Sequence, residues 1–222
     1  MEEKLTVDVG DDADNVRLDV DGRFIVVGVV GHGSGAVAVL DLQTLKKIAE
    51  IKLPGHPEAF ELERGTPRIF VNVPSGDEVI VADRSTQKVI TTWKLAGAGR
   101  NFPMALDAVH KLLYVGCRRS AKLLVIDTDS GTVVASPECV GDADEVFVDA
   151  KSGRILVVGG DGGGAIDLFE TKDQFAYTKL TSMKTAAGAR TGLLVAELRA
   201  LFIAVPKRSD KQAEIREYTV PD

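Results

Sequence analysis

The sequence predicts an all-β protein, a five-bladed β-propeller with four strands in each blade. Three observations lead to this fold class: an apolar run that recurs five times, short strand-like segments between these runs, and a composition typical of one compact domain. The chain has 222 residues, of which 45 % are hydrophobic. This length is sufficient for one sizeable core.

The recurring run carries most of this prediction. Each copy is a six-residue segment dominated by Val, Ile, Leu and Phe, and the copies begin at Arg23, Arg68, Lys111, Arg154 and Ala200. They are therefore separated by 45, 43, 43 and 46 residues. A four-stranded propeller blade has about 40–45 residues. The spacing thus predicts one blade for each copy.

Three further strand-like segments accompany each run, one before it and two after it, and turn residues separate them. The resulting units cover approximately 15–53, 58–95, 103–140, 145–183 and 191–220. The region Ala186–Val205 also has leucines at helical spacing. We nevertheless predict strands there, because Gly192–Val195 aligns with Val146–Asp149 of the preceding unit.

The fifth unit is one strand short, and the N-terminus is expected to supply that strand. After Val205 only Ala213–Val220 can form a strand. Val9–Val16 repeats the segment Val140–Val146, which follows the outer strand of its own unit. We therefore predict that residues 3–9 complete the last blade, which would leave no unpaired edge. The predicted single domain then covers residues 1–222.

Composition limits the classes of partner. The net charge is −6, and phosphate binding requires a basic patch that the sequence does not show. No apolar run approaches the roughly 20 residues that span a bilayer. Met1–Lys4 does not begin a signal peptide. We expect no nucleic-acid partner, no membrane insertion, and two buried free thiols at Cys117 and Cys139.

Several segments resemble the YncE-like, YVTN-repeat β-propellers. The segments that carry the resemblance are Asp11–Arg17, Leu53–Glu58, Asn101–Asp107 and Leu113–Cys117. The literal YVTN tetrapeptide does not occur, and Tyr114–Cys117 (YVGC) is nearest to it. Members of this family usually have seven WD40-like blades and are often exported. The resemblance implies the C-terminal five blades of such a protein, and the family offers no general catalytic signature.

Polar residues are concentrated in the loops that lead into the inner strands. These loops also carry Arg100 and Asp142, and the candidate site residues are Asp14, Asn15, Arg17, His56, Glu58, Asn101, Asp144, Glu145 and Arg190. We expect them to surround the mouth of the central channel and to hold a small polar ligand or a protein partner. The alternative is that they are hydrated and cap the strands. Arg17 and Arg190 are expected to compensate the crowded carboxylates.

No catalytic residue, metal or cofactor is predicted. His56 and Glu58 would form an acid–base pair only if a turn at Pro57 brought them together. Gly159–Gly164 is interpreted as a hairpin turn, because neither a helix nor a Lys-Ser/Thr pair follows it. The favoured function is a non-enzymatic binding or scaffold propeller. The alternatives are a metal-assisted lactonase-like hydrolase and a truncated propeller without biochemical activity.

Overall fold

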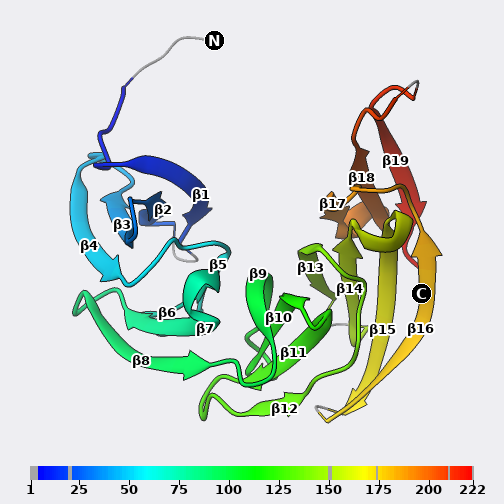
Figure 1. Cartoon of the computed structure of the whole chain (residues 1–222). Coiled ribbons are helices and arrows are strands. Elements are labelled where there is room, and N and C mark those ends of the chain that lie inside the picture. Colours follow the sequence, from blue (N-terminus) through cyan, green and yellow to red (C-terminus); the bar gives the residue numbers. More distant parts are fainter. Residues whose placement is uncertain (1–4, 20–21, 150–151, 174, 210, 222) are drawn as a thin grey trace. The chain divides into compact units, whose positions relative to one another are not determined.

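The computed structural model describes residues 5–19, 22–149, 152–173, 175–209 and 211–221. Over these residues the chain is all-β and forms five antiparallel sheets, as the sequence predicts. The sheets are divided between two compact units, residues 1–96 and 97–222, and each unit is described by itself (Figure 1). Within the described residues, no helix is long and apolar enough to cross a membrane.

The first unit contains two sheets in which the strands follow one another in chain order (Figure 1). The first sheet consists of β1 (Asp12–Leu18), β2 (Phe24–Val30), β3 (Gly35–Asp41) and β4 (Lys47–Leu53). The second consists of β5 (Phe60–Leu62), β6 (Arg68–Val73), β7 (Glu78–Asp83) and β8 (Lys88–Lys94), with the short 3-10 turn η1 (Pro74–Gly76) between β6 and β7.

The second unit contains three sheets with the same sequential order. Its first sheet consists of β9 (Gly99–Asp107), β10 (Leu112–Arg119), β11 (Lys122–Asp127) and β12 (Val133–Ala135). Its second consists of β13 (Ala143–Asp149), β14 (Arg154–Gly159), β15 (Ala165–Asp173) and β16 (Ala176–Lys184), with η2 (Asp161–Gly163) between β14 and β15. Its third consists of β17 (Thr191–Val195), β18 (Ala200–Val205) and β19 (Glu214–Thr219), with η3 (Ala196–Leu198) between β17 and β18.

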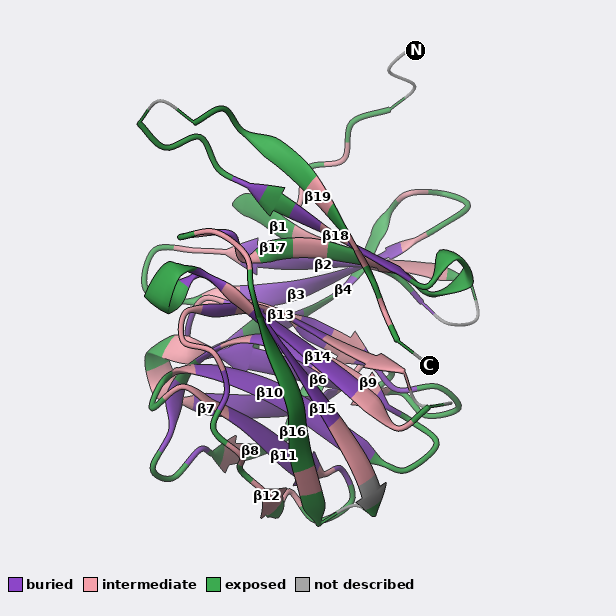
Figure 2. Ribbon diagram, turned by 90° about the vertical axis from the view of Figure 1, so that its right-hand side faces the viewer, coloured by how far each residue is buried: buried purple, intermediate pink, exposed green. Residues whose placement is uncertain are grey.

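The five recurring apolar runs form the second strand of each sheet, namely β2, β6, β10, β14 and β18. These strands are largely buried, whereas outer strand β16 is mostly exposed (Figure 2). Both faces of an inner sheet are covered: Tyr114 of β10 and Val157 of β14 share one core cluster, and Leu156 and Ile203 share the next. Burial on both faces explains why the runs are continuously apolar rather than alternating.

A carboxylate ends the third strand of the first three sheets. Asp41, Asp83 and Asp127 each accept hydrogen bonds from the turn that follows, and their Oδ1 atoms lie 2.6–2.7 Å from the hydroxyl of Thr44, Ser85 or Ser130. These hydrogen bonds lower the pKa of all three carboxyls. The side chain therefore satisfies turn amides that the ladder leaves unpaired.

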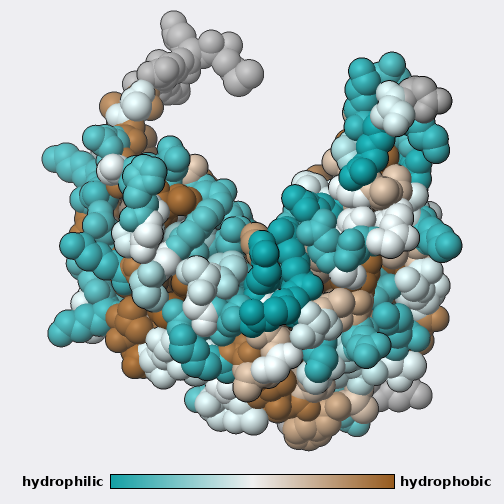
Figure 3. Space-filling view, in the orientation of Figure 1, coloured by the Kyte–Doolittle hydropathy of each residue, from teal (hydrophilic) through white to brown (hydrophobic). Residues whose placement is uncertain are grey.

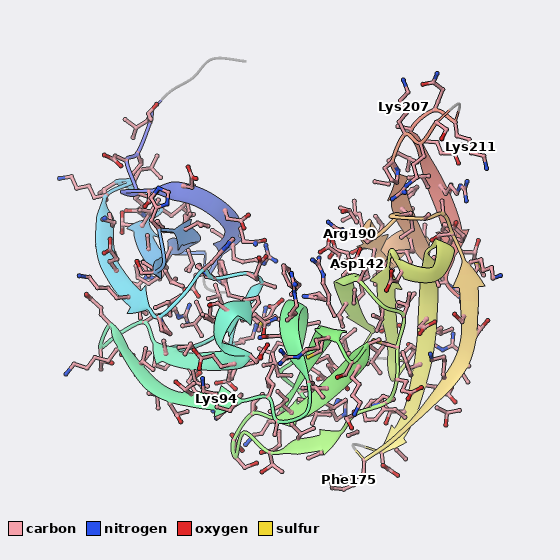
Figure 4. All side chains as sticks on the ribbon, in the orientation of Figure 1. Lys94, Asp142, Phe175, Arg190, Lys207 and Lys211 are labelled. Carbon is pink, nitrogen blue, oxygen red and sulfur yellow. The ribbon has the colours of Figure 1, made fainter. Side chains whose placement is uncertain are left out.

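The end of the β18–β19 hairpin is polar. Figure 3 shows hydrophilic residues gathered at the end of the β18–β19 hairpin. Lys207 and Lys211 extend from that end (Figure 4). Such charged ends keep the edge of a sheet from pairing with other chains.

One outer strand is shorter than expected. The outer strand of the third sheet is expected over Val133–Val140, but β12 ends at Ala135. Pro137 has no N–H to donate to the ladder, and its carbonyl instead accepts a hydrogen bond from Leu123 N–H at 3.0 Å. A proline at this point shortens the strand.

The fifth sheet has three strands over the described residues. Residues 5–9 form no strand, and residues 3 and 4 lie outside the described residues. Val9 packs against Val29, Ala36 and Ala38 of the first sheet. Pairing of residues 3–9 with β19 would join the two units, so completion of the last blade by the N-terminus stays a prediction, as does the single domain over residues 1–222.

The region Ala186–Val205 contains two strands and a short turn, not a long helix. The turn η3 ends at Arg199, whose φ of 53° places it in the left-handed region. Asp77 plays the same part after η1, with a φ of 48°. Repeat alignment therefore outweighs local helix propensity here, and a non-glycine residue accepts the left-handed conformation.

Both cysteines are buried free thiols, as predicted. Cys117 lies in β10, and Cys139 belongs to the core cluster between the third and fourth sheets. Burial raises the pKa of the Cys139 thiol to about 12. A thiol with so high a pKa is a small hydrophobe and not a nucleophile at neutral pH.

Candidate functional site

The candidate residues are divided between the two units. Asp14, Asn15, Arg17, His56 and Glu58 belong to the first unit, and Asn101, Asp144, Glu145 and Arg190 belong to the second. A single channel mouth lined by all of them would join the units and stays a prediction. Each group is therefore described within its own unit.

β-Bulges interrupt two of the inner strands at candidate residues. In β1 the register passes from Asp14 opposite Gly28 to Val16 opposite Val27, so Asn15 is the extra residue. In β13 it passes from Ala143 opposite Gly159 to Glu145 opposite Val158, so Asp144 is the extra residue. A bulge redirects the side chains beside it, and such bulges are frequent near functional sites.

In the first unit, Asp14, His56 and Glu58 converge. His56 Nε2 lies 3.6 Å from Asp14 Oδ2 and 3.9 Å from Glu58 Oε1. One ligand atom from each of the three residues lies within 4.8 Å of the others. Pro57, between His56 and Glu58, is buried, and the irregular segment before β5 places the two side chains on the same side of the chain, with Nε2 and Oε1 3.9 Å apart.

Local hydrogen bonds fix the backbone and one carboxylate oxygen of this group. The backbone N–H of Asn15 donates to Asp14 Oδ1 at 2.8 Å, which leaves Oδ2 toward His56. The backbone N–H of Glu58 donates to the carbonyl of Asn72 at 2.9 Å. The bulge in β1 and the start of β5 therefore set the positions of the carboxylates.

Arg17 lies near a carboxyl that the sequence analysis did not select. Its guanidinium carbon is 5.7 Å from the centre of the Phe60 ring. Burial raises the pKa of the neighbouring Glu61 carboxyl to about 7, and the charge of Arg17 offsets part of this increase. Glu61 reads in the sequence as an ordinary surface position of a short strand, so only its burial reveals it.

In the second unit, two arginines and two aspartates form a closed network, which we call the charged network. Arg190 Nη1 donates to Asp142 Oδ2 at 2.7 Å, and Arg190 Nε lies 3.3 Å from Asp144 Oδ2. Arg118 Nε lies 3.3 Å from Asp142 Oδ1, and Arg118 Nη2 donates to Asp144 Oδ1. Figure 4 shows Arg190 and Asp142 side by side.

Arg118 is the best buried member of the charged network. Its side chain is 16 % exposed, and its guanidinium carbon lies 3.6 Å from the centre of the Phe102 ring. Its Nε also donates to the carbonyl of Ala143 at 3.0 Å. The hydrogen bond that Arg190 donates to Asp142 raises the pKa of Arg190. The carboxylates of this site are thus compensated by arginines.

The sequence analysis found only part of the charged network. The sequence predicts Arg190 and Asp144 as site residues, and it places Asp142 in the same loop as Asp144. Loop position does not predict Arg118, because this residue lies near the end of β10, the second strand of its sheet, and not in a loop that leads into an inner strand. Asn101 is fully buried in β9, and Glu145 follows the bulge in β13. These two candidates lie outside the charged network.

Comparisons with known proteins support the fold. No known protein family matches the sequence, and no curated protein matches it. Solved structures of β-propeller-like proteins do match. Hydrazine synthase from Kuenenia stuttgartiensis has a TM-score of 0.78 at 14 % identity, over 93 % of this chain and 62 % of that one.

Two further structures are similar. A functionally unknown protein from Desulfotomaculum acetoxidans has a TM-score of 0.73 at 14 % identity, over 94 % of this chain and 68 % of that one. A chain of a mitotic checkpoint complex has a TM-score of 0.65 at 13 % identity, over 96 % and 76 %. This chain thus spans about three fifths to three quarters of these proteins. At such low identity, the structural similarity establishes the β-propeller fold alone. The resemblance to the YncE-like family stays a prediction.

Proposed function

We propose that this chain is a non-enzymatic binding module whose charged network contacts an acidic segment of a protein partner. The observation that carries the proposal is the mutual pairing of Arg118, Asp142, Asp144 and Arg190 at a partly exposed surface. Propellers commonly bind their partners with the loops that lead into the inner strands. The proposal therefore agrees with the fold, although the fold alone does not establish it.

The pairing favours binding over catalysis. A general base needs a carboxylate that can accept a proton from a substrate. Asp142 and Asp144 each contact both arginines, at 2.7–3.3 Å in three of the four pairs. Because their oxygens are occupied as acceptors, they are poor candidates for acid–base chemistry. They hold the two guanidiniums rigidly in place instead.

A rigid guanidinium is a good receptor for a carboxylate. The side chain of Arg190 is 41 % exposed, and its contacts with Asp142 and Asp144 engage Nη1 and Nε. Among the described residues, Nη2 is left to face a partner. A guanidinium offers about five N–H donors in a planar fork that matches a carboxylate. Since the network already orders this side chain, little entropy is lost on binding.

A peptide titration followed by NMR tests this function. We expect a hexaglutamate peptide to shift the amide signals around Arg190 and Arg118, and a hexalysine peptide to leave them unchanged. Arg190→Gln should weaken hexaglutamate binding roughly fivefold, equivalent to about 1 kcal/mol. The matched control is Arg216→Gln, which removes an exposed arginine paired with Glu214 on β19.

Equal weakening by the two substitutions would show general charge attraction and would overturn the proposed surface. Absence of hexaglutamate binding to the unmodified chain would also overturn it. Binding that resists 0.5 M salt would be inconsistent with a contact built on partly exposed charges.

A further inference from the structure

We propose that Asp14, His56 and Glu58 form a binding site for one divalent first-row transition-metal ion, with Zn²⁺ as the representative. The site lies wholly within the first unit. It goes beyond the binding function proposed above and does not depend on it, because the charged network belongs to the second unit.

The distances between the donor atoms fit an ion better than they fit direct hydrogen bonds. Two ligand atoms at about 2.1 Å from a tetrahedral ion are separated by about 3.4 Å. His56 Nε2 lies 3.6 Å from Asp14 Oδ2 and 3.9 Å from Glu58 Oε1. Hydrogen bonds from nitrogen to oxygen are about 2.7–3.2 Å long. All three donor atoms lie within 4.8 Å of one another, so small side-chain movements would bring them to the separations found around a bound ion.

The imidazole nitrogen supplies a second, independent observation. His56 Nε2 is inaccessible to solvent and makes no hydrogen bond, and it faces the two carboxylates. A buried polar nitrogen without a partner is costly, and most such atoms in proteins are hydrogen-bonded. Coordination through the Nε2 lone pair would satisfy this atom and neutralise the adjacent carboxylates at once.

The set of donors indicates the class of ion. One imidazole and two carboxylates suit Zn²⁺, Fe²⁺ or Mn²⁺, whereas Ca²⁺ and Mg²⁺ prefer oxygen ligands alone. Three protein ligands leave a fourth position for water. The side chains of Asp14 and His56 are 45 % and 42 % exposed, so that position is open to solvent.

The ligands are held in place before an ion arrives. The Asn15 N–H fixes Asp14 Oδ1 at 2.8 Å, and the buried Pro57 restricts the backbone between His56 and Glu58. Hydrogen bonds of this kind orient a ligating carboxylate and increase metal affinity. Among the described residues, this is the one group of three or more His, Cys, Asp or Glu side chains with such spacing.

Calorimetric titration of the full chain with ZnCl₂ is the first test. We expect one Zn²⁺ per chain, and His56→Gln should weaken its binding at least tenfold. The matched control is His110→Gln, because His110 Nδ1 also lies close to one carboxylate, 2.7 Å from Asp107 Oδ2, without belonging to the three-residue group. Unchanged binding in His110→Gln supports the site. Equal effects of the two substitutions, or no Zn²⁺ binding, overturn it.

A second measurement needs no variant and is therefore independent of folding defects. The chain has three histidines, so their ring signals can be resolved by NMR while MnCl₂ is added below one equivalent. The paramagnetic ion should broaden the ring signals of His56 before those of His32 and His110. Simultaneous broadening of all three, or earlier broadening of His32 or His110, would overturn the proposal.

Discussion

The charged network and the group of Asp14, His56 and Glu58 each contain two carboxylates but differ in the nitrogen groups that face them. In the charged network, two guanidiniums contact Asp142 and Asp144, with pairs as short as 2.7 Å at Arg190. In the first unit, a single imidazole nitrogen lies 3.6 Å and 3.9 Å from two carboxylates. The arginines of the first arrangement reach hydrogen-bond distance of their carboxylates, whereas the imidazole nitrogen of the second does not.

This difference shows that the number of carboxylates does not by itself define a site. A guanidinium has enough donors to engage two carboxylates at once. A neutral imidazole has one donor and one acceptor, so it cannot satisfy two carboxylates. Two carboxylates are therefore held at hydrogen-bond distance beside arginine, whereas beside histidine they lie 3.6 Å and 3.9 Å from the ring nitrogen. The following variants test this contrast, in order of decreasing effect.

Arg118→Ala should cause the largest loss of stability. It removes a partly buried guanidinium from two carboxylates and from the Phe102 ring at 3.6 Å. We expect the free energy of unfolding to fall by about 2–3 kcal/mol, because charged partners are left uncompensated. Urea titration at pH 7 measures this change. Arg118→Lys, which keeps the charge but loses the planar fork, should lose about half as much; a loss below about 0.5 kcal/mol in Arg118→Ala would contradict the network's role.

Glu61→Gln should stabilise the chain at neutral and alkaline pH but not near pH 4. The folded-state pKa of Glu61 is about 7, raised by burial from 4.5. Folding therefore loses stability as the pH rises from about 4.5 through 7, where the unfolded chain releases this proton and the folded chain retains it. Since Glu61 is partly exposed, we expect the variant to gain about 1–2 kcal/mol at pH 8. Thermal melts at pH 4 and pH 8 should show the gain at pH 8 alone.

Arg190→Ala should cause a smaller loss than Arg118→Ala, because its side chain is 41 % exposed. We expect a loss of about 1 kcal/mol at pH 7 and a smaller loss near pH 4, where carboxylates begin to be protonated and the ion pairs weaken. Paired denaturant titrations of the unmodified chain and the variant at both pH values measure this difference. An equal loss at the two pH values would exclude an electrostatic role for Arg190.

Asp14→Asn should have the smallest effect when metal is removed with a chelator. Its carboxylate contacts His56 at 3.6 Å and is 45 % exposed. Exposed pairs of this kind contribute little, so a loss of about 0.3 kcal/mol is expected. Denaturant titration in chelator-containing buffer checks it. A loss as large as that of Arg118→Ala would mean that the two clusters are equally saturated and would remove the contrast.

The sequence predicts the sheets well because each second strand must be apolar on both faces. The run beginning at Arg154 can be read directly, because its strand β14 packs against a neighbouring sheet on each face. The short outer strand β12 could be anticipated only from Pro137. The left-handed Arg199 could not be anticipated, because its conformation depends on the turn around it and not on its own propensity.

The sites are predicted less completely, for geometric reasons. Loop position singles out Asp144 and Arg190 as candidates, whereas Arg118 reaches Asp142 and Asp144 from near the end of β10. The bulges at Asn15 and Asp144 have no reliable sequence signal, yet they place the neighbouring carboxylates. The contact between His56 and Glu58 depends on the irregular backbone around Pro57. Such details are fixed by strand register, which one sequence does not specify.

The sequential pairing of strands within each sheet has a consequence for amide hydrogen exchange. Every backbone ladder connects strands that are neighbours in the chain, and no ladder crosses from one sheet to another over the described residues. Cooperative opening can therefore proceed one sheet at a time, because adjacent sheets are joined by side-chain packing and isolated hydrogen bonds, such as that from Arg118 Nε to the carbonyl of Ala143. Exchange rates should fall into groups that follow the sheet boundaries, and β17–β19, which has three strands, should lose its protection before β13–β16.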